Sequence, residues 1–207
     1  MKIVVFGASG KCGAHLVRLA RERGHEVLAV ARANAAVPDD VPVARGDVLD
    51  ESFVREIVVG SDTVASGLGM RYAHPWAARH SPNDFVERAT TNLIASRPRR
   101  LVVISAAGVG DSRAAMNWPM RALLATSNVG VAYADLERAE AALRASDLDW
   151  QAVRPTTLTN GARTDRVTVT DRYRATDRIA RIDVAAFMLA TLEAPTIDDR
   201  TPMITTG

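Results

Sequence analysis

The sequence has one cysteine, Cys12, few aromatic residues (5%) and no long apolar run. A single cysteine excludes a disulfide framework and indicates a reducing compartment. Without ~18–20 consecutive apolar residues, the chain has no ordinary membrane-spanning helix. Met1 is followed by a short apolar run and then by glycines, which fits neither a signal peptide nor a transit peptide. We therefore expect a soluble cytoplasmic protein that does not engage a membrane.

Lysine is also scarce, because Lys2 and Lys11 are the only two. The 26 basic residues are balanced by 24 acidic ones, which leaves a net charge of +2. Arg97, Arg99 and Arg100 form the one dense basic run, directly before an apolar segment. A solvated strand entrance explains this run better than a phosphate-backbone contact does. We expect no nucleic-acid partner.

Short apolar runs alternate with segments of helical periodicity along the 207 residues, a length suited to one domain spanning 1–207. The helical periodicity that begins near His15 stops at Gly24. Further helices are predicted at 52–59, 83–95, 133–145 and 182–192. Strands are predicted at 2–6, 26–31, 42–44, 62–66, 101–105, 150–153 and 202–205.

The strands are apolar runs rather than alternating patterns, which is typical of a parallel sheet with both faces covered by helices. The predicted fold class is α/β, a Rossmann-like doubly wound parallel sheet with a short C-terminal elaboration on the substrate side. Residues 67–82 and 106–130 show weak periodicity, and each stretch follows a predicted strand. Both should therefore begin at the carboxyl edge of the sheet, where open α/β folds bind ligands.

A glycine-rich turn follows the first strand and opens the first helix. Its sequence is Gly7-Ala8-Ser9-Gly10-Lys11-Cys12-Gly13. Glycines here serve a tight turn, close approach of the backbone to a pyrophosphate, and close packing of the helix on the strand. The helix N-terminus then offers N–H groups to the phosphates. We predict dinucleotide binding by Gly7, Ser9, Gly10, Lys11, Cys12 and Gly13.

Two other interpretations of this turn fail on individual residues. A Walker-type phosphate loop needs Ser or Thr where Cys12 stands and glycine where Val5 stands. A hydrolase nucleophile elbow centred on Ser9 needs glycine where Lys11 stands. Cys12 itself could gain thiolate character near a helix start, although a small buried filler is the simpler interpretation.

The end of the second strand favours NADP(H) over NAD(H). An NAD site places an acid there, whereas this chain has Arg32 and no acid until Asp39. Arg32 could pair with a 2′-phosphate, with Lys11 adding a second charge, although a solvated loop arginine remains the alternative. Asp47 and Val48 fit an adenine contact, or else Asp47 simply begins a helix.

Four motifs resemble the atypical short-chain dehydrogenase/reductase superfamily. They are VVFGASGKCG near the start, GDVLD at 46–50, LVVISAAGV at 101–109 and LRASDLDWQAVRPTTLTNG at 143–161. The similarity is to the compact NAD(P)H-binding branch, which includes biliverdin reductase B-like flavin reductases and NmrA-like proteins. The resemblance implies three cofactor contacts: the loop Gly67, Leu68 and Gly69 under the cofactor, Ser105 near the nicotinamide, and Pro155, Thr156 and Thr157 beside its ribose and carboxamide.

One departure from the superfamily concerns catalysis. Its catalytic members carry Tyr-x-x-x-Lys, and the corresponding segment here begins at Tyr133 and places Glu137 where the lysine belongs. An acid disfavours a nearby phenolate. Ser105 and Tyr133 are the candidate catalytic residues, but the usual tyrosine acid mechanism is not expected. Flavin-reductase relatives manage without that pair, because hydride transfer to an oxidising ring needs mainly positioning.

Segments 70–76 and 116–120 contain aromatic and methionine side chains, which suit flat apolar rings or else close the core. His74 and His80 have no partners at metal-ligand spacing, so we expect no metal. The leading hypothesis is an NADPH-dependent reductase of a flavin, a quinone or a similar aromatic small molecule, acting as monomer or homodimer. The alternative is a non-catalytic NADP(H)-binding sensor of the NmrA-like type. A sugar epimerase needs a larger C-terminal substrate region.

Overall fold

The computed structural model describes residues 1–37, 40–70, 74–77, 81–116, 118–174 and 176–206. Its centre is an eight-stranded sheet in the order β3-β2-β1-β4-β5-β6-β10-β8. All neighbouring strands are parallel except β10 and β8. A separate parallel pair is formed by β7 and β9. The strands are β1 (Lys2–Phe6), β2 (Glu26–Ala31), β3 (Val43–Arg45), β4 (Thr63–Ser66), β5 (Arg100–Ile104), β6 (Asp149–Pro155), β7 (Thr157–Thr159), β8 (Thr168–Val169), β9 (Arg178–Ala180) and β10 (Met203–Thr205).

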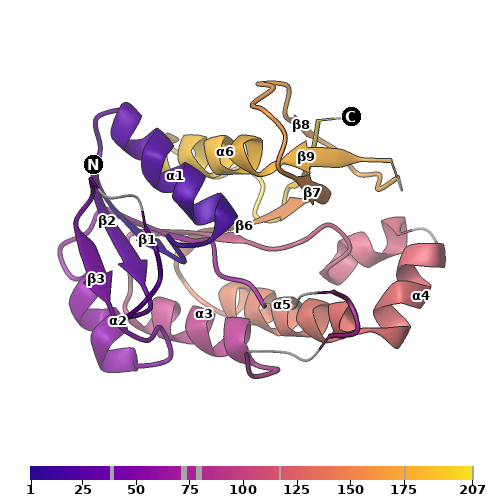
Figure 1. The fold of residues 1–207 in the computed structure, drawn as a ribbon, viewed down its shortest axis with the longest axis horizontal. Coiled ribbons are helices and arrows are strands. Elements are labelled where there is room, and N and C mark those ends of the chain that lie inside the picture. Colours follow the sequence, from indigo (N-terminus) through magenta and orange to yellow (C-terminus); the bar gives the residue numbers. More distant parts are fainter. Residues whose placement is uncertain (38–39, 71–73, 78–80, 117, 175, 207) are drawn as a thin grey trace.

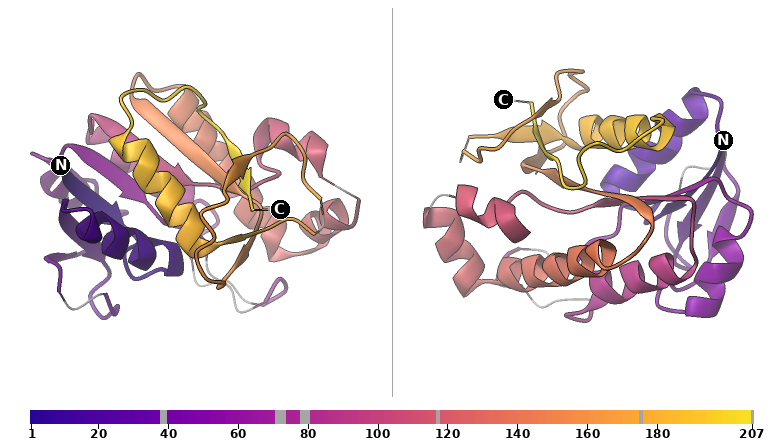
Figure 2. Two further views of the ribbon diagram at one scale, coloured as in Figure 1. Left: turned by 90° about the horizontal axis from the view of Figure 1, so that it is seen from above. Right: turned by 180° about the vertical axis from the view of Figure 1, so that it is seen from behind.

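Helices cover both faces of this sheet (Figures 1 and 2). One face packs α1 (Lys11–Glu22) and α6 (Arg181–Glu193), and the other packs α2 (Glu51–Val58), α3 (Phe85–Ala95) and α5 (Asn128–Arg144). Because each central strand is buried on both sides, β1 and β4 consist almost wholly of buried residues. The sheet order and the two helical layers confirm the predicted Rossmann-like α/β fold class.

Two helices on the same face begin with carboxylate caps. Asp50 accepts hydrogen bonds from the backbone N–H groups of Ser52 and Phe53 at the start of α2. At the start of α3 the cap comes from another helix: the buried carboxylate of Asp135, on α5, accepts from the N–H groups of Val86 (2.8 Å) and Glu87 (3.0 Å). A cap of this kind satisfies N–H groups that the helix itself leaves unpaired.

Structure also appears where the periodicity was weak. The predicted stretch 106–130 contains a 3-10 helix, Gly110–Ala115, and α4 (Trp118–Thr126), and α5 begins at Asn128 rather than at 133. Only Leu124 of α4 is buried, so this helix lacks the apolar face that periodicity detects. Strands β7 and β9, of three residues each, were not predicted, whereas the equally short β3 and β10 were. Of the stretch 67–82, residues 71–73 and 78–80 lie outside the described residues.

Arg100 corrects the expectation of a solvated strand entrance. Its side chain is buried, pairs with Asp149 (2.7 Å) and donates to backbone carbonyls at the C-terminal end of α6, among them that of Thr191 (2.9 Å). Arg97 is exposed and pairs with Asp147, as a solvated arginine would. Within the described ranges, no helix is both long and apolar enough to cross a bilayer.

Candidate functional site

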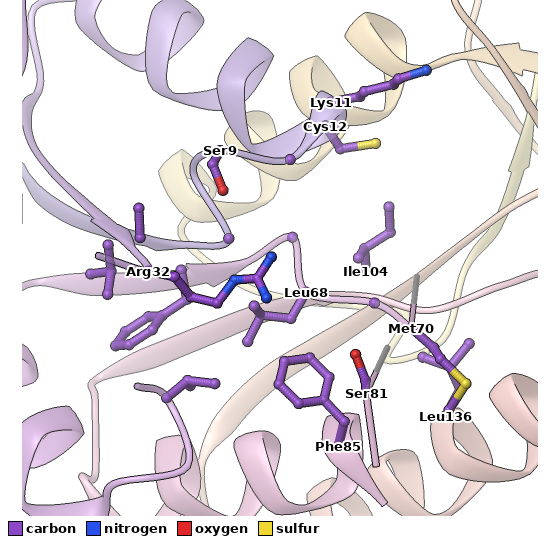
Figure 3. Close-up of a pocket in the computed structure, with 18 of the residues that line it drawn as sticks. Ser9, Lys11, Cys12, Arg32, Leu68, Met70, Ser81, Phe85, Ile104 and Leu136 are labelled. Carbon is purple, nitrogen blue, oxygen red and sulfur yellow. The ribbon is translucent and has the colours of Figure 1, made fainter. Parts of the chain in front are cut away.

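A cavity of about 600 Å³ opens at the carboxyl edge of the sheet, below the N-terminus of α1 (Figure 3). It is built from the segments that follow β1, β2, β3, β4 and β5, together with side chains from α3, α5 and α6. Its lining residues are Phe6, Gly7, Ser9, Gly10, Lys11, Cys12, Val30, Ala31, Arg32, Gly46, Asp47, Val48, Gly67, Leu68, Gly69, Met70, Ser81, Phe85, Ile104, Ser105, Leu136, Leu158 and Arg181.

The glycine-rich turn forms the upper wall of this cavity. Gly7 has φ +73°, a conformation that favours glycine, and its carbonyl accepts from the Gly10 N–H at 2.8 Å. Gly13 does not line the cavity; a Cβ there would overlap the carbonyl oxygen of Gly7, so its role is close packing of helix on turn. Unlike α2, helix α1 has no side-chain cap and no acidic residue in its first turn. Its N-terminus is therefore open to an anion.

One end of the cavity, called here the Arg32 end, is lined by Ser9, Arg32, Gly46, Asp47 and Val48. Arg32 is exposed, points into the cavity and makes no ion pair with any described residue (Figure 3). Arg45 holds the loop in shape, because its Nη1 donates to the carbonyls of Arg32, Ala33 and Ala35 at 3.0–3.1 Å. A guanidinium without an ion-pair partner among the described residues, on a loop held by Arg45, is suited to bind an anionic group.

Lys11 lies elsewhere than the sequence suggested. It lines the cavity, but its side chain points away from Arg32 (Figure 3). The second charge expected beside Arg32 is therefore not positioned there. Asp47 and Val48 do reach the Arg32 end, where Oδ1 of Asp47 accepts from the N–H of Leu49 at 2.9 Å and Val48 is buried. An acid and an apolar side chain thus stand together at this end.

Cys12 is a neutral thiol. It lines the cavity but is 8% exposed, and burial raises its pKa from 9.0 to about 11 even though the charge of Arg181 opposes the shift. A thiol in this state carries no thiolate at neutral pH. The simpler of the two interpretations of Cys12, a small buried filler, therefore agrees with its surroundings.

The part of the cavity at the end of β5 is called the Ser105 end. Its lining residues are Met70, Phe85, Ile104, Ser105, Leu136 and Leu158. Gly67, Leu68 and Gly69 form the floor between the two ends. Pro155, Thr156 and Thr157 are not among the lining residues, although Leu158 is. The reason is that the chain passes from β6 into β7: Thr156 Oγ1 is buried against Thr205 Oγ1 (3.2 Å), and Thr157 contacts the hydroxyl of Tyr173 (3.3 Å).

Ser105 rests on a buried cluster of charges. Its hydroxyl lies 2.6 Å from Oε1 of Glu140, which is itself paired with Arg154 and Arg144. Glu140 and Arg154 are each 1% exposed. Burial by itself would lower the pKa of Arg154, but its hydrogen bonds to Glu140 and Asp111 raise that pKa above the usual value. The guanidinium of Arg154 therefore remains charged, as a buried ion does only when it is paired.

Tyr133 is not part of the cavity lining. Its hydroxyl donates to the carbonyl of Ala107 at 3.1 Å, and Glu137 is exposed to solvent. Helix α5 instead turns Leu136 toward the cavity and Glu140 toward Ser105, two positions one turn apart. The sequence did not single out Leu136, Glu140 or Arg154. The signal available was Glu140 itself, a charged residue between alanines in the predicted helix.

The aromatic segments contribute less to the cavity than expected. Trp76 is 63% exposed and Trp118 is 79% exposed, and neither lines it. Met70 does, and Phe85 is an aromatic lining residue that the sequence did not indicate. Tyr72 and His80, by contrast, lie outside the described residues. Among residues the structure describes, no group of His, Cys, Asp and Glu side chains could hold a metal ion.

The chain is similar in sequence and in fold to known proteins. The uncharacterized protein YwnB of Bacillus subtilis is 33% identical over 112 residues, 52% of this chain and 48% of YwnB, so the match spans about half of that curated relative. The structure of ChuY, an anaerobilin reductase from Escherichia coli O157:H7, matches with a TM-score of 0.80 and 25% identity over 99% of this chain and 96% of ChuY.

A candidate NADH-flavin reductase from Streptococcus pneumoniae shares the fold, with a TM-score of 0.76 and 19% identity over 99% of both chains. The likeness to ChuY confirms the resemblance to the compact NAD(P)H-binding branch that the sequence motifs indicated. A family model described as NAD(P)H-binding matches residues 7–195. The chain therefore belongs to the NAD(P)H-binding family.

Proposed function

We propose that this protein is an NADPH-dependent oxidoreductase that transfers hydride to a flat conjugated acceptor such as a flavin or a quinone. The observation that carries the cofactor preference is Arg32, at the end of β2. Its guanidinium points into the cavity and pairs with no residue that the structure describes (Figure 3). A site selective for NAD has an acid at this place, which would repel a 2′-phosphate. The planar guanidinium instead matches a phosphate.

The residues present fit the rest of the cofactor. The uncapped N-terminus of α1 and the tight turn at Gly7 would receive the pyrophosphate. Asp47 would accept from the adenine amine while Val48 packs on the ring. Bound NADPH would supply the hydride. The protein's part is to orient the ring that receives it and to keep water away from the transfer.

The Ser105 end supports a flat, largely apolar acceptor. Ile104, Leu136 and Leu158 present aliphatic surface there, and Met70 and Phe85 add polarizable and aromatic surface. A mostly apolar wall with few polar groups is typical of small-molecule sites. The names of the structural neighbours, a bilin reductase and a candidate flavin reductase, support the same acceptor class.

Calorimetric titration with NADPH and NADH tests the cofactor preference. We expect NADPH to bind at least tenfold more tightly, a difference of about 1.4 kcal/mol. Arg32→Asp should remove most of that difference, whereas Arg99→Asp, an equal charge change at an exposed site outside the cavity lining, should leave it intact. Equal affinities in the unmutated protein would refute the preference.

The alternative is a non-catalytic NADP(H) sensor. Its support is that the hydroxyl of Tyr133 is bound to Ala107 and that α5 turns Leu136, an aliphatic residue, toward the cavity. Loss of NADPH absorbance with a panel of flavins and quinones separates the two functions. Steady oxidation of NADPH supports the reductase, and tight NADPH binding without oxidation supports the sensor.

A further inference from the structure

We propose that Ser105 offers its oxygen, not its proton, to the ligand, and that Glu140 is the positioning residue that enforces this polarity. The ligand group that Ser105 receives is therefore an N–H donor on the bound ring system. This inference rests on the proposed function, because it takes the Ser105 end of the cavity as the place where the rings lie.

The carboxylate of Glu140 is fully occupied by donors. Oε1 lies 2.6 Å from the hydroxyl of Ser105 and 3.0 Å from Nε of Arg154. Oε2 lies 2.6 Å from Nη2 of Arg154 and 2.7 Å from Nη2 of Arg144. An ionised carboxylate has about four acceptor positions, and here four donors fill them.

The same contacts decide which group holds the proton in the Ser105–Glu140 contact. Arginine side chains only donate hydrogen bonds. If Glu140 carried a proton, its O–H would either point at an arginine N–H group or take the place of a hydrogen bond from arginine. The single hydroxyl proton of Ser105 therefore lies in the 2.6 Å contact to Oε1.

With that proton committed, the hydroxyl of Ser105 has only lone pairs left. Its backbone is fixed by the bond from its N–H to the carbonyl of Val153 at 2.7 Å, so the side chain is held at the end of β5 where it lines the cavity. A ligand carbonyl placed against this oxygen would meet an acceptor. A ligand N–H would find an acceptor there. A ligand that leaves such a polar group of the site unpaired binds much more weakly.

Two ring systems could supply the N–H: the carboxamide of the nicotinamide or a ring nitrogen of the acceptor. The first source is tested with NADP⁺ and its 3-acetylpyridine analogue, which lacks the amide N–H. The second is tested with lumiflavin and 3-methyllumiflavin as acceptors. In one of the two pairs, the compound that carries the N–H should bind the unmutated protein about tenfold more tightly than its partner. The difference is measured as Kd for the NADP⁺ pair and as KM for the flavin pair, where kcat should change less.

Ser105→Ala should reduce that preference to within about twofold while leaving the Glu140–Arg154 pair in place. Glu140→Gln should also reduce it, since the amide can donate to Ser105 and release the hydroxyl proton toward the ligand. Arg144→Gln is the matched control: it alters a contact to Oε2 and leaves the Ser105 contact to Oε1. The preference should survive in that variant.

If Glu140→Gln does not fold, Ser105→Ala decides the matter alone. The inference is overturned if unmutated protein shows no preference in either pair, or if Ser105→Ala keeps the preference in full. Either result is compatible with tight NADPH binding and turnover, which would leave the proposed function standing. Failure to bind NADPH or NADH at all would instead overturn the proposed function together with this inference.

Discussion

The two ends of the cavity are held in place by different means. At the Arg32 end an exposed arginine stands on a loop whose shape depends on backbone carbonyls bound to Arg45. At the Ser105 end a hydroxyl rests on Glu140 and Arg154, two charges removed almost entirely from solvent. A side chain at the first end can change without disturbing the fold. At the second end recognition and stability depend on the same groups.

The largest expected effect comes from breaking the Ser105 end. Glu140→Ala should lower the free energy of unfolding by about 3–5 kcal/mol, because it leaves the buried charge of Arg154 without its main partner. Urea unfolding followed by circular dichroism measures the loss. Glu137→Ala, on the exposed side of the same helix, and Arg32→Ala, at the other end, should each stay within about 0.5 kcal/mol. If all three variants lost similar amounts of unfolding free energy, the two ends of the cavity would not differ in their contribution to stability.

The next effect concerns the turn that joins the two ends. Gly10→Val should weaken NADPH binding at least hundredfold, about 2.7 kcal/mol, because a branched side chain would cover the N–H groups at the start of α1. A Cβ at this position would lie 3.1 Å from the carbonyl oxygen of Gly7, so Gly10→Ala controls for that contact. Micromolar binding by a folded Gly10→Val protein would show that the dinucleotide lies elsewhere.

A smaller effect is expected from Tyr133→Phe. Its hydroxyl is bound to the carbonyl of Ala107 and does not line the cavity, so kcat should fall less than tenfold, under about 1.4 kcal/mol of barrier. The free energy of unfolding should fall by about 1 kcal/mol for the lost hydrogen bond. A general acid contributes roughly 10²–10⁴-fold. A thousandfold loss on a ketone substrate would make Tyr133 such an acid.

The last expected effect is confined to alkaline pH and comes from Cys12, which also lines the cavity. With a pKa near 11, its thiol should react with iodoacetamide at pH 8 more slowly than glutathione does. Above pH 9 the unfolded chain ionises its cysteine while the folded chain does not. The free energy of unfolding should therefore decline between about pH 9 and 11. The decline should be smaller in the Cys12→Ser variant, which has no thiol to ionise. Fast labelling at pH 8 in the folded protein would show that the thiol is ionised.

The sequence predicted the Arg32 end better than the Ser105 end, for a physical reason. The strand before Gly7, the turn itself and Arg32 at the end of β2 are local features that neighbouring residues determine. The face that α5 presents is a tertiary property. The motif alignment placed Tyr133 and Glu137 at the site, whereas the packed helix presents Leu136 and Glu140. Residues on a helix are rotated by about 100° per position, so a small shift selects another face.

The departure of the chain after β6 was equally hidden from local patterns. Pro155, Thr156 and Thr157 lie where the chain leaves the main sheet for the short pair of β7 and β9. Neither β7 nor β9 was predicted, although β3 and β10, of the same length, were. The placement of this segment depends on tertiary contacts such as that between Thr156 and Thr205. The lining contact therefore falls on Leu158, one residue beyond the predicted segment.

The cap that Asp135 places on α3 has a consequence for the shape of the Ser105 end. Phe85 begins α3, and Leu136 follows Asp135 on α5; both side chains reach the cavity (Figure 3). The carboxylate of Asp135, on α5, accepts hydrogen bonds from the N–H groups of Val86 and Glu87 and so ties the start of α3 to α5. Figure 3 shows both side chains on one side of the cavity, across from Lys11 and Cys12 at the start of α1. Main-chain hydrogen bonds therefore hold Phe85 and Leu136 in fixed relative positions, and the apolar surface that they present to a ligand is assembled before the ligand arrives.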